Sequence, residues 1–205
     1  MYKRSAVICE GTQEKMDVEY FLKRQKWFKG SAPLVLFAPM QPKAAAGQIA
    51  RSALDRVRIA KSEGCDPIIV IIDREELLDC PPILKRNIEV AFQKFEYSVN
   101  VVIKNRKFEN WLIADIHAIS ACKEFSVSKS FRRKVEPDKA DHVDNASDWL
   151  KMANCLRQYE KNKHPRAILE KADCKRIAGN SRSFRRFLRL LEHPDYLDQS
   201  RRPAR

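Results

Sequence analysis

Acidic residues follow two of the strand-like runs in this sequence. Glu10 ends a short apolar run and precedes Gly11, whereas Asp73 ends a longer apolar run and has Glu75 two positions beyond it. Carboxylate oxygens without nitrogen or sulfur ligands favour a hard cation such as Mg²⁺ or Mn²⁺. Held by Glu10, Asp73 and Glu75, such an ion would polarise a phosphate group and orient a nucleophilic water. Glu10 stands on a different strand from the other two, which suits it to act as the carboxylate that transfers a proton during the reaction.

Strand-like and helical stretches alternate four times in the first 120 residues, which predicts the elements that must position these acids. Five consecutive β-branched residues, at 68–72, are typical of a central parallel strand that is buried on both faces. We therefore predict an α/β fold with a parallel sheet of about four strands flanked by helices. Ligands of such sheets bind beyond the carboxyl ends of the strands, where Glu10 and Asp73 would meet. The predicted strands are 5–10, 33–39, 67–73 and 99–103, and the predicted helices are 13–26, 44–62, 82–95 and 108–119.

The last part of the chain is the more basic. The net charge is +13, and residues 151–205 contain 15 Lys and Arg against 6 Asp and Glu. We predict a catalytic domain at 1–122 and a basic, mainly helical region at 123–205, with a polar loop at 123–147 and helices at 148–162, 165–175 and 183–192. A basic helical face can follow a phosphate backbone or dock on an acidic partner. The arginines expected to contact nucleic acid are Arg132, Arg133, Arg182, Arg185, Arg186 and Arg189.

Several classes of protein are disfavoured by the composition. The six cysteines form no Cys-x-x-Cys pair and the four histidines show no zinc spacing, so we expect reduced thiols rather than a zinc site. No apolar run approaches about 18 residues, and the N-terminal run is too short for a secretory signal. We therefore expect a cytoplasmic protein that does not enter a membrane.

The acidic motifs resemble those of TOPRIM domains, which carry a glutamate after the first strand and Asp-x-Asp after the third. Here the matching residues are Glu10 and Asp73, and Glu75 takes the place of the second aspartate. The stretches 9–14 and 107–115 (KFENWLIAD) and the helical tail are similar to small stand-alone TOPRIM-fold nuclease-like proteins, the RloB-like and related groups. These are cousins of the overcoming-lysogenization-defect nucleases.

This resemblance implies a Mg²⁺-dependent nuclease effector of bacterial anti-phage defence, acting on DNA or RNA, including transfer RNA. It also implies an ABC- or AAA-type ATPase encoded nearby, because the chain has no Gly-x₄-Gly-Lys-Ser/Thr motif of its own. Glu109, which follows the fourth strand, is expected at the same edge as Glu10, and Lys104 is expected to grip the scissile phosphate. Trp111 is expected in the core. Asp115 is expected on a polar helix face. A further role for Asp115, the role of Glu76, and a homodimer are left open.

Other interpretations of the same residues remain. Asp73 could serve only as the N-cap of a helix, and Glu109 could serve only to favour the dipole of the helix that it begins. A phosphoacceptor receiver-like domain also gathers acids at strand ends, but it would need paired acids after the first strand. A third interpretation is an inactive TOPRIM-like module that binds nucleic acid or a partner.

Overall fold

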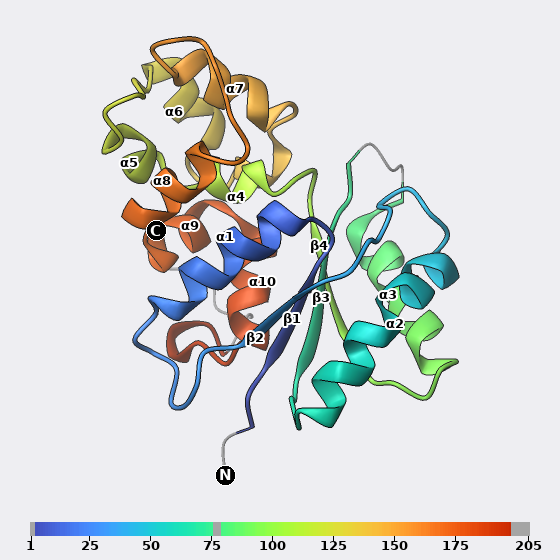
Figure 1. Cartoon of the computed structure of the whole chain (residues 1–205). Helices are drawn as coiled ribbons and strands as arrows, with labels where there is room; N and C mark the ends of the chain where they lie inside the picture. Colours follow the sequence, from blue (N-terminus) through green and yellow to red (C-terminus); the bar gives the residue numbers. More distant parts are fainter. Residues whose placement is uncertain (1–2, 76–78, 198–205) are drawn as a thin grey trace. The chain divides into compact units, whose positions relative to one another are not determined.

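The computed structural model describes residues 3–75 and 79–197, which form two compact units (Figure 1). Within the described residues, unit 1 comprises 3–75, 79–103 and 186–197, and unit 2 comprises 104–185. Unit 2 is therefore inserted, along the chain, between two segments of unit 1. The predicted division at residue 122 into a catalytic and a basic domain stays a prediction.

A four-stranded, all-parallel sheet with the strand order β2-β1-β3-β4 forms the centre of unit 1, which confirms the predicted α/β fold. In the register, Ala6 pairs with Leu34 on one side and with Ile68 on the other. The first two strands therefore start level with the third, and their carboxyl ends lie close together. The strands are β1 (Ala6–Cys9), β2 (Leu34–Phe37), β3 (Ile68–Asp73) and β4 (Asn100–Lys104), the last residue of which belongs to unit 2.

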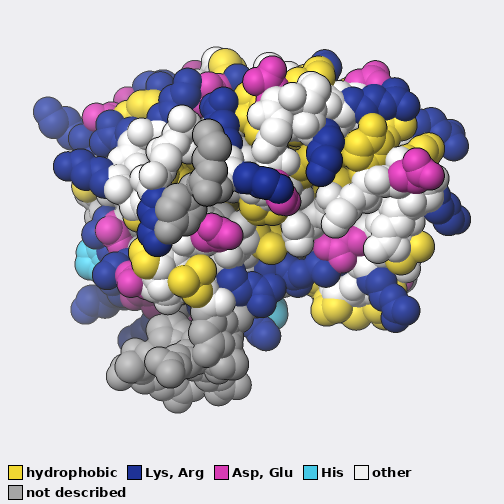
Figure 2. All heavy atoms as spheres, turned by 90° about the horizontal axis from the view of Figure 1, so that it is seen from below, with side chains coloured by type: hydrophobic (Ala, Val, Ile, Leu, Met, Phe, Trp, Pro, Cys, Tyr) yellow, Lys and Arg dark blue, Asp and Glu magenta, His cyan; other side chains and the backbone are white. Residues whose placement is uncertain are grey.

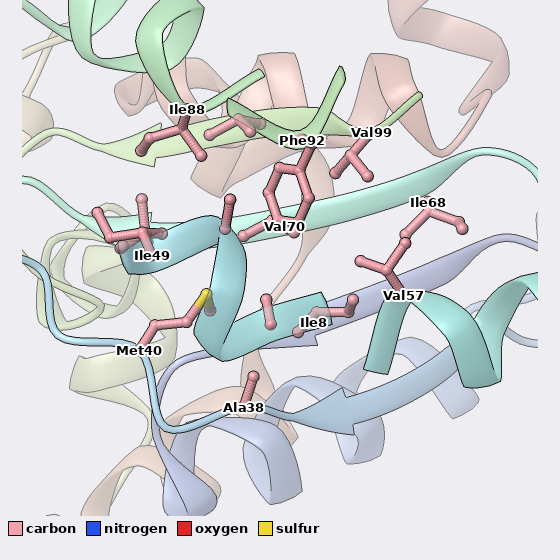
Figure 3. Close-up of a cluster of buried hydrophobic side chains, with 14 of the residues drawn as sticks. Ile8, Ala38, Met40, Ile49, Val57, Ile68, Val70, Ile88, Phe92 and Val99 are labelled. Atoms are coloured by element: carbon pink, nitrogen blue, oxygen red, sulfur yellow. The ribbon is translucent and has the colours of Figure 1, made fainter. Parts of the chain in front are cut away.

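Helices cover both faces of this sheet, as the unbroken apolar strands require. Helices α2 (Ala46–Ser62) and α3 (Pro81–Gln93) pack on one face, and α1 (Thr12–Lys23) lies on the other (Figure 1). Alternate strand residues such as Ile8 and Val70 point toward α2 and α3, where they meet Ile49, Val57 and Phe92 in a continuous core (Figure 3). This core fixes the strands whose ends carry the acids.

Unit 2 is helical and departs from the predicted elements in four places. The predicted helix 165–175 ends at Lys171, and a separate helix begins at Cys174. The predicted helix 108–119 is two helices, because Asp115 is the N-cap of the second and accepts a hydrogen bond from the backbone N–H of Ala118. The predicted loop 123–147 contains a helix, α6, which Ser128 caps. The predicted helix 148–162 ends at Ala153, where the chain turns. The helices are α4 (Glu109–Ile113), α5 (Ile116–Ser120), α6 (Lys129–Val135), α7 (Ala146–Ala153), α8 (His164–Lys171) and α9 (Cys174–Asn180).

Helix α10 (Arg182–Leu190) matches the predicted helix 183–192 closely, and its residues from Arg186 onward belong to unit 1. The start of α10 is fixed within unit 2 by Asp141. This buried carboxylate accepts hydrogen bonds from the Ser181 hydroxyl at 2.7 Å and from the backbone N–H of Ser183 at 2.8 Å. No helix of the described residues is long and apolar enough to span a bilayer.

Candidate metal and nucleic-acid site

Glu10 and Asp73 meet at the carboxyl edge of the sheet. Glu10 follows β1, Asp73 is the last residue of β3, and the backbone N–H of Asp73 donates a hydrogen bond to Oε1 of Glu10 at 2.9 Å. The second oxygen of Glu10, Oε2, and one oxygen of Asp73, Oδ1, are buried atoms. Glu10 and Asp73 therefore lie side by side at the ends of neighbouring strands, and their expected role as metal ligands stays a prediction.

Glu75 lies two residues past the strand in a different setting. Its backbone φ of 50° is in the left-handed region, which is uncommon for a residue other than glycine. Its carboxylate is part-exposed and lies 3.5 Å from the ammonium group of Lys43, in the loop after β2. Glu75 is thus near the same edge, but it is engaged with a cation rather than gathered with Glu10 and Asp73. Glu76 lies outside the described residues.

Two further acids near this edge were missed by reasoning from the sequence. Glu14 and Asp17 lie in the first turns of α1, directly after Glu10, and their side chains are 8% and 1% exposed. Asp17 accepts a hydrogen bond from the amide of Gln13 at 3.2 Å. The sequence does contain a signal for these two acids. Their helical spacing from Val18, Phe21 and Leu22 puts them on the same face of the helix as these apolar residues.

The two remaining predicted catalytic residues belong to unit 2. Lys104 is completely buried, and its ammonium group lies 5.8 Å from the centre of the Phe108 ring. Glu109 begins α4, as expected, and is 5% exposed, with Lys161 at 3.5 Å from its carboxylate. Buried charged side chains are rare in proteins unless they are paired. Lys104 and Glu109 are therefore not ordinary solvated charges of the protein surface.

Trp111 and Asp115 have structural roles in unit 2. The indole N–H of Trp111 donates to the Ser183 hydroxyl at 2.8 Å, and the residue is buried, which confirms its predicted place in the core. Asp115 was predicted to lie on a polar helix face, and this was wrong. It is 1% exposed and accepts from the backbone N–H of Asp173 and from Nε of Arg176 at 2.8 Å. This pairing raises the pKa of Arg176.

The four arginines of α10 do not form a single exposed basic face. Arg185 is tied into unit 2, where it donates to a carboxylate oxygen of Asp138 at 2.9 Å and also to a backbone carbonyl. Arg186 belongs to unit 1, and its pKa is lowered because burial disfavours its charged form. Arg189 is half-buried, and only Arg182 among these four arginines is well exposed. The basic face expected on this helix is therefore present only in part.

The exposed positive charge of unit 2 lies largely on other elements. Arg132 and Arg133 are exposed on α6, and Arg132 pairs with Glu136 at 3.1 Å. Residues 104–185 contain 19 Lys and Arg against 11 Asp and Glu, a balance of +8. Figure 2, which shows the molecule from below, has Lys and Arg side chains spread among acidic and hydrophobic ones over that face, without distinguishing the two units. Unit 2 therefore has the charge that a phosphate backbone attracts.

The donor set at the sheet edge fits a hard divalent ion. Glu10 and Asp73 offer oxygen atoms only, and Mg²⁺ commonly takes one or two carboxylates and completes its shell with water and substrate phosphate. Among the described residues, no three His, Cys, Asp or Glu side chains already form a ligating group. The role of Glu10 and Asp73 as ligands of such an ion stays a prediction.

A model of a protein family matches most of this chain. Residues 9–192 match the family model described as Domain of unknown function (DUF4276), a span that includes both acidic motifs and the whole described part of unit 2. No curated protein and no solved structure matches the sequence.

Proposed function

The chain belongs to the DUF4276 family, and we propose that it is a Mg²⁺-dependent nuclease that hydrolyses phosphodiester bonds at Glu10 and Asp73. The observation that carries the proposal is the hydrogen bond from the Asp73 backbone to the Glu10 carboxylate. It supports a site in which both side chains hold one ion at the carboxyl edge of a parallel sheet. The resemblance of these motifs to TOPRIM-fold nucleases points to the same chemistry.

Each residue of the edge has a distinct part in this proposal. Glu10 is oriented through Oε1, which accepts the Asp73 N–H, and its other oxygen and the Asp73 carboxylate would hold the ion. Mg²⁺ bound there would polarise the phosphate and lower the pKa of a bound water. The start of α1, immediately after Glu10, presents backbone N–H groups that favour an anionic group such as phosphate.

We further propose that the substrate is DNA or RNA and that a partner ATPase controls the activity in anti-phage defence. The basic balance of unit 2 supports the nucleic-acid part, because phosphate contacts dominate non-specific affinity. The ATPase and the defence role rest on the resemblance to RloB-like proteins and on the missing phosphate-binding loop motif in the sequence.

The alternative is an inactive module that binds nucleic acid or a partner through the same basic unit. One observation favours it: the Glu75 carboxylate, which replaces the expected second aspartate, lies 3.5 Å from Lys43. A site that has lost its third acid would retain the fold and the charge without hydrolysis.

Digestion assays separate these two functions. Purified full-length chain is incubated with single- and double-stranded DNA and with cellular RNA, with Mg²⁺ or with EDTA, alone and with the neighbouring ATPase if one is encoded. The nuclease proposal expects Mg²⁺-dependent fragments that disappear in Glu10→Gln. Salt-dependent binding without fragments under every one of these conditions would establish the inactive module instead.

A further inference from the structure

Unit 2 contains a pocket of about 490 Å³ that the proposed catalytic edge does not use. Helix α6 and the residues before it form one wall, and α7 with the turn after it forms the other. Its size is within the range of small-molecule and nucleotide sites. The lining residues are Ser126, Ser128, Ser130, Phe131, Trp149, Met152, Ala153, Asn154, Cys155 and Arg157.

Two aromatic side chains, Trp149 and Phe131, line this pocket. Trp149 is half-buried, and its ring packs on that of Phe131, with ring centres 5.3 Å apart and planes inclined by 38°. Phe131 is 2% exposed, so it supports the indole from the core side. An indole held in this way is a rigid surface for stacking, and base–aromatic stacking contributes about 1–3 kcal/mol per base.

The walls of the pocket are fixed before any ligand binds. The backbone N–H of Ser126 donates to the carbonyl of Ala153 at 2.7 Å, and that of Cys155 donates to the carbonyl of Glu124 at 2.8 Å. The buried Asn154 side chain accepts from the N–H of the residue two positions on. Filling the pocket therefore costs little conformational entropy in its walls.

The polar groups of the pocket suit a nucleotide. The three serines supply hydroxyl groups, two of which, on Ser128 and Ser130, lie 2.8 Å apart, and hydroxyls can both donate and accept. Arg157 donates one N–H to the carbonyl of Met152, at 2.9 Å, and its guanidinium is exposed with four further donors. No Asp or Glu lines this pocket, so nothing on its walls repels a phosphate.

We propose that this pocket binds an unpaired base of a nucleic-acid strand, with Trp149 stacked on the base and Arg157 facing its phosphate. The inference rests on the proposed function and narrows its substrate class to nucleic acid with a single-stranded or splayed-out nucleotide. A base that is paired in a duplex cannot offer its face to the indole. The +8 balance of unit 2 favours a polyanion over an apolar peptide, although Met152 in the pocket wall and Leu156 beside the pocket are exposed.

Binding titrations in EDTA test this without any cleavage step. Fluorescein-labelled dT₁₂ and rU₁₂ strands and a 12-base-pair duplex are titrated with the full-length chain. We expect either single strand to bind more tightly than the duplex, and Trp149→Ala to weaken single-strand binding about tenfold while duplex binding and the salt slope stay the same. Trp149→Phe should retain most of the affinity. Equal weakening for strand and duplex, or no weakening, would overturn the inference.

Leu156→Ala is the matched control, because this side chain is 73% exposed next to the pocket and has no ring to stack. It should leave single-strand binding unchanged. If Leu156→Ala weakens single-strand binding as much as Trp149→Ala does, the apolar rim rather than base stacking accounts for the pocket, and the inference fails.

A second measurement, the chemical labelling of Cys155, tests the pocket without substituting any residue that lines it. Cys155 lines the pocket and is exposed, and Cys80 is the other exposed cysteine of the six. In a Cys80→Ser background, saturating dT₁₂ or rU₁₂ should slow maleimide labelling of Cys155 several-fold, and the duplex should not. If Cys155 is labelled at the same rate with saturating strand, the pocket inference is overturned. The proposed function is tested separately, by Mg²⁺-dependent cleavage. Absence of cleavage in every assay together with protection of Cys155 would instead support the pocket alone.

Discussion

The carboxylate of Glu10 accepts a hydrogen bond from the backbone N–H of Asp73, so the ends of two adjacent parallel strands are joined through a side chain. This bond uses one oxygen of Glu10 and none of the Asp73 carboxylate. The remaining oxygens are therefore positioned by the sheet itself rather than by a mobile loop. A site built on strand ends in this way has the rigidity that ion binding and catalysis need.

Glu10→Gln should abolish Mg²⁺-dependent cleavage without unfolding the chain. The glutamine amide keeps an oxygen that accepts the Asp73 N–H but removes the negative charge that an ion requires. Glu10→Ala should also be inactive and, in addition, should lower stability by about 1 kcal/mol, because the N–H loses its acceptor. Cleavage assays and thermal unfolding check both, with the exposed Glu63→Gln as control. Wild-type cleavage by Glu10→Gln would remove this residue from the mechanism.

Asp73→Asn should weaken Mg²⁺ or Mn²⁺ binding strongly, whereas Glu75→Gln should weaken it less. The reason is placement: Asp73 contributes a buried oxygen beside Glu10, whereas the Glu75 carboxylate lies against Lys43. Calorimetric titration of Mg²⁺ and spectroscopic titration of Mn²⁺ measure the difference. Equal weakening in the two variants would show that Glu75 leaves Lys43 and ligates the ion as fully as Asp73 does.

Asp115→Ala should destabilise the chain by about 2–4 kcal/mol, since it removes a helix cap and the buried partner of Arg176. The effect should be the same with and without Mg²⁺, because Asp115 is engaged structurally. Denaturant unfolding measures it, and Asp144→Ala, at a 70% exposed carboxylate, is the control expected to change little. A variant that keeps its stability but loses metal affinity would reverse this assignment.

Glu124 should contribute to stability in a pH-dependent way. Hydrogen bonds from Lys163 and then His164 lower the pKa of its carboxyl from the ordinary value of 4.5. Because the folded pKa is lower than the unfolded one, the stabilisation is fully present above about pH 4.5 and is lost as pH falls through the lowered value. Wild type should therefore unfold at a higher temperature than Glu124→Gln at neutral pH, and the gap should close in acid. A gap that is independent of pH would contradict the ion pairing.

Arg132 and Arg133, rather than Arg185, should set the salt dependence of nucleic-acid binding. Both are exposed on α6, whereas Arg185 is held by Asp138. Changing Arg132 and Arg133 to Gln should reduce the slope of log affinity against log salt by roughly 0.7–0.9 for each phosphate that the protein then leaves unneutralised. Arg185→Gln should mainly lower the unfolding temperature. An unchanged slope in the double variant would assign α6 to another role.

The sheet could be predicted because its signal is local. The run Ile68–Ile72 is too apolar and too β-branched for anything but a strand buried on both faces, and strands of this kind end at a common edge. That logic was enough to bring Glu10 and Asp73 together. It could not place Glu75, whose position follows from a left-handed backbone turn and from Lys43, which stands 32 positions earlier in the sequence.

Unit 2 was harder to predict because its helices are short and end on tertiary contacts. Helix α7 stops at Ala153, where the chain turns to pair Asn154 with Phe125, a bridge between residues 29 positions apart. The pocket beside Trp149 was not predicted for the same reason. Asp115 is buried and paired with Arg176, which stands 61 positions later in the sequence. The spacing of the residues around Asp115 could not reveal this partner, so Asp115 was predicted to lie on a polar helix face.

The return of the chain to unit 1 after residue 185 limits how the protein can be shortened. A fragment that stops at residue 122 would retain all four strands but lack Phe187, Leu188 and Leu191, which are 1%, 0% and 3% exposed in the intact chain. Such a truncation is expected to aggregate or to need a chaperone. A minimal version of unit 1 would require a designed linker that joins residue 103 to residue 186, so that the segment removed is internal rather than C-terminal.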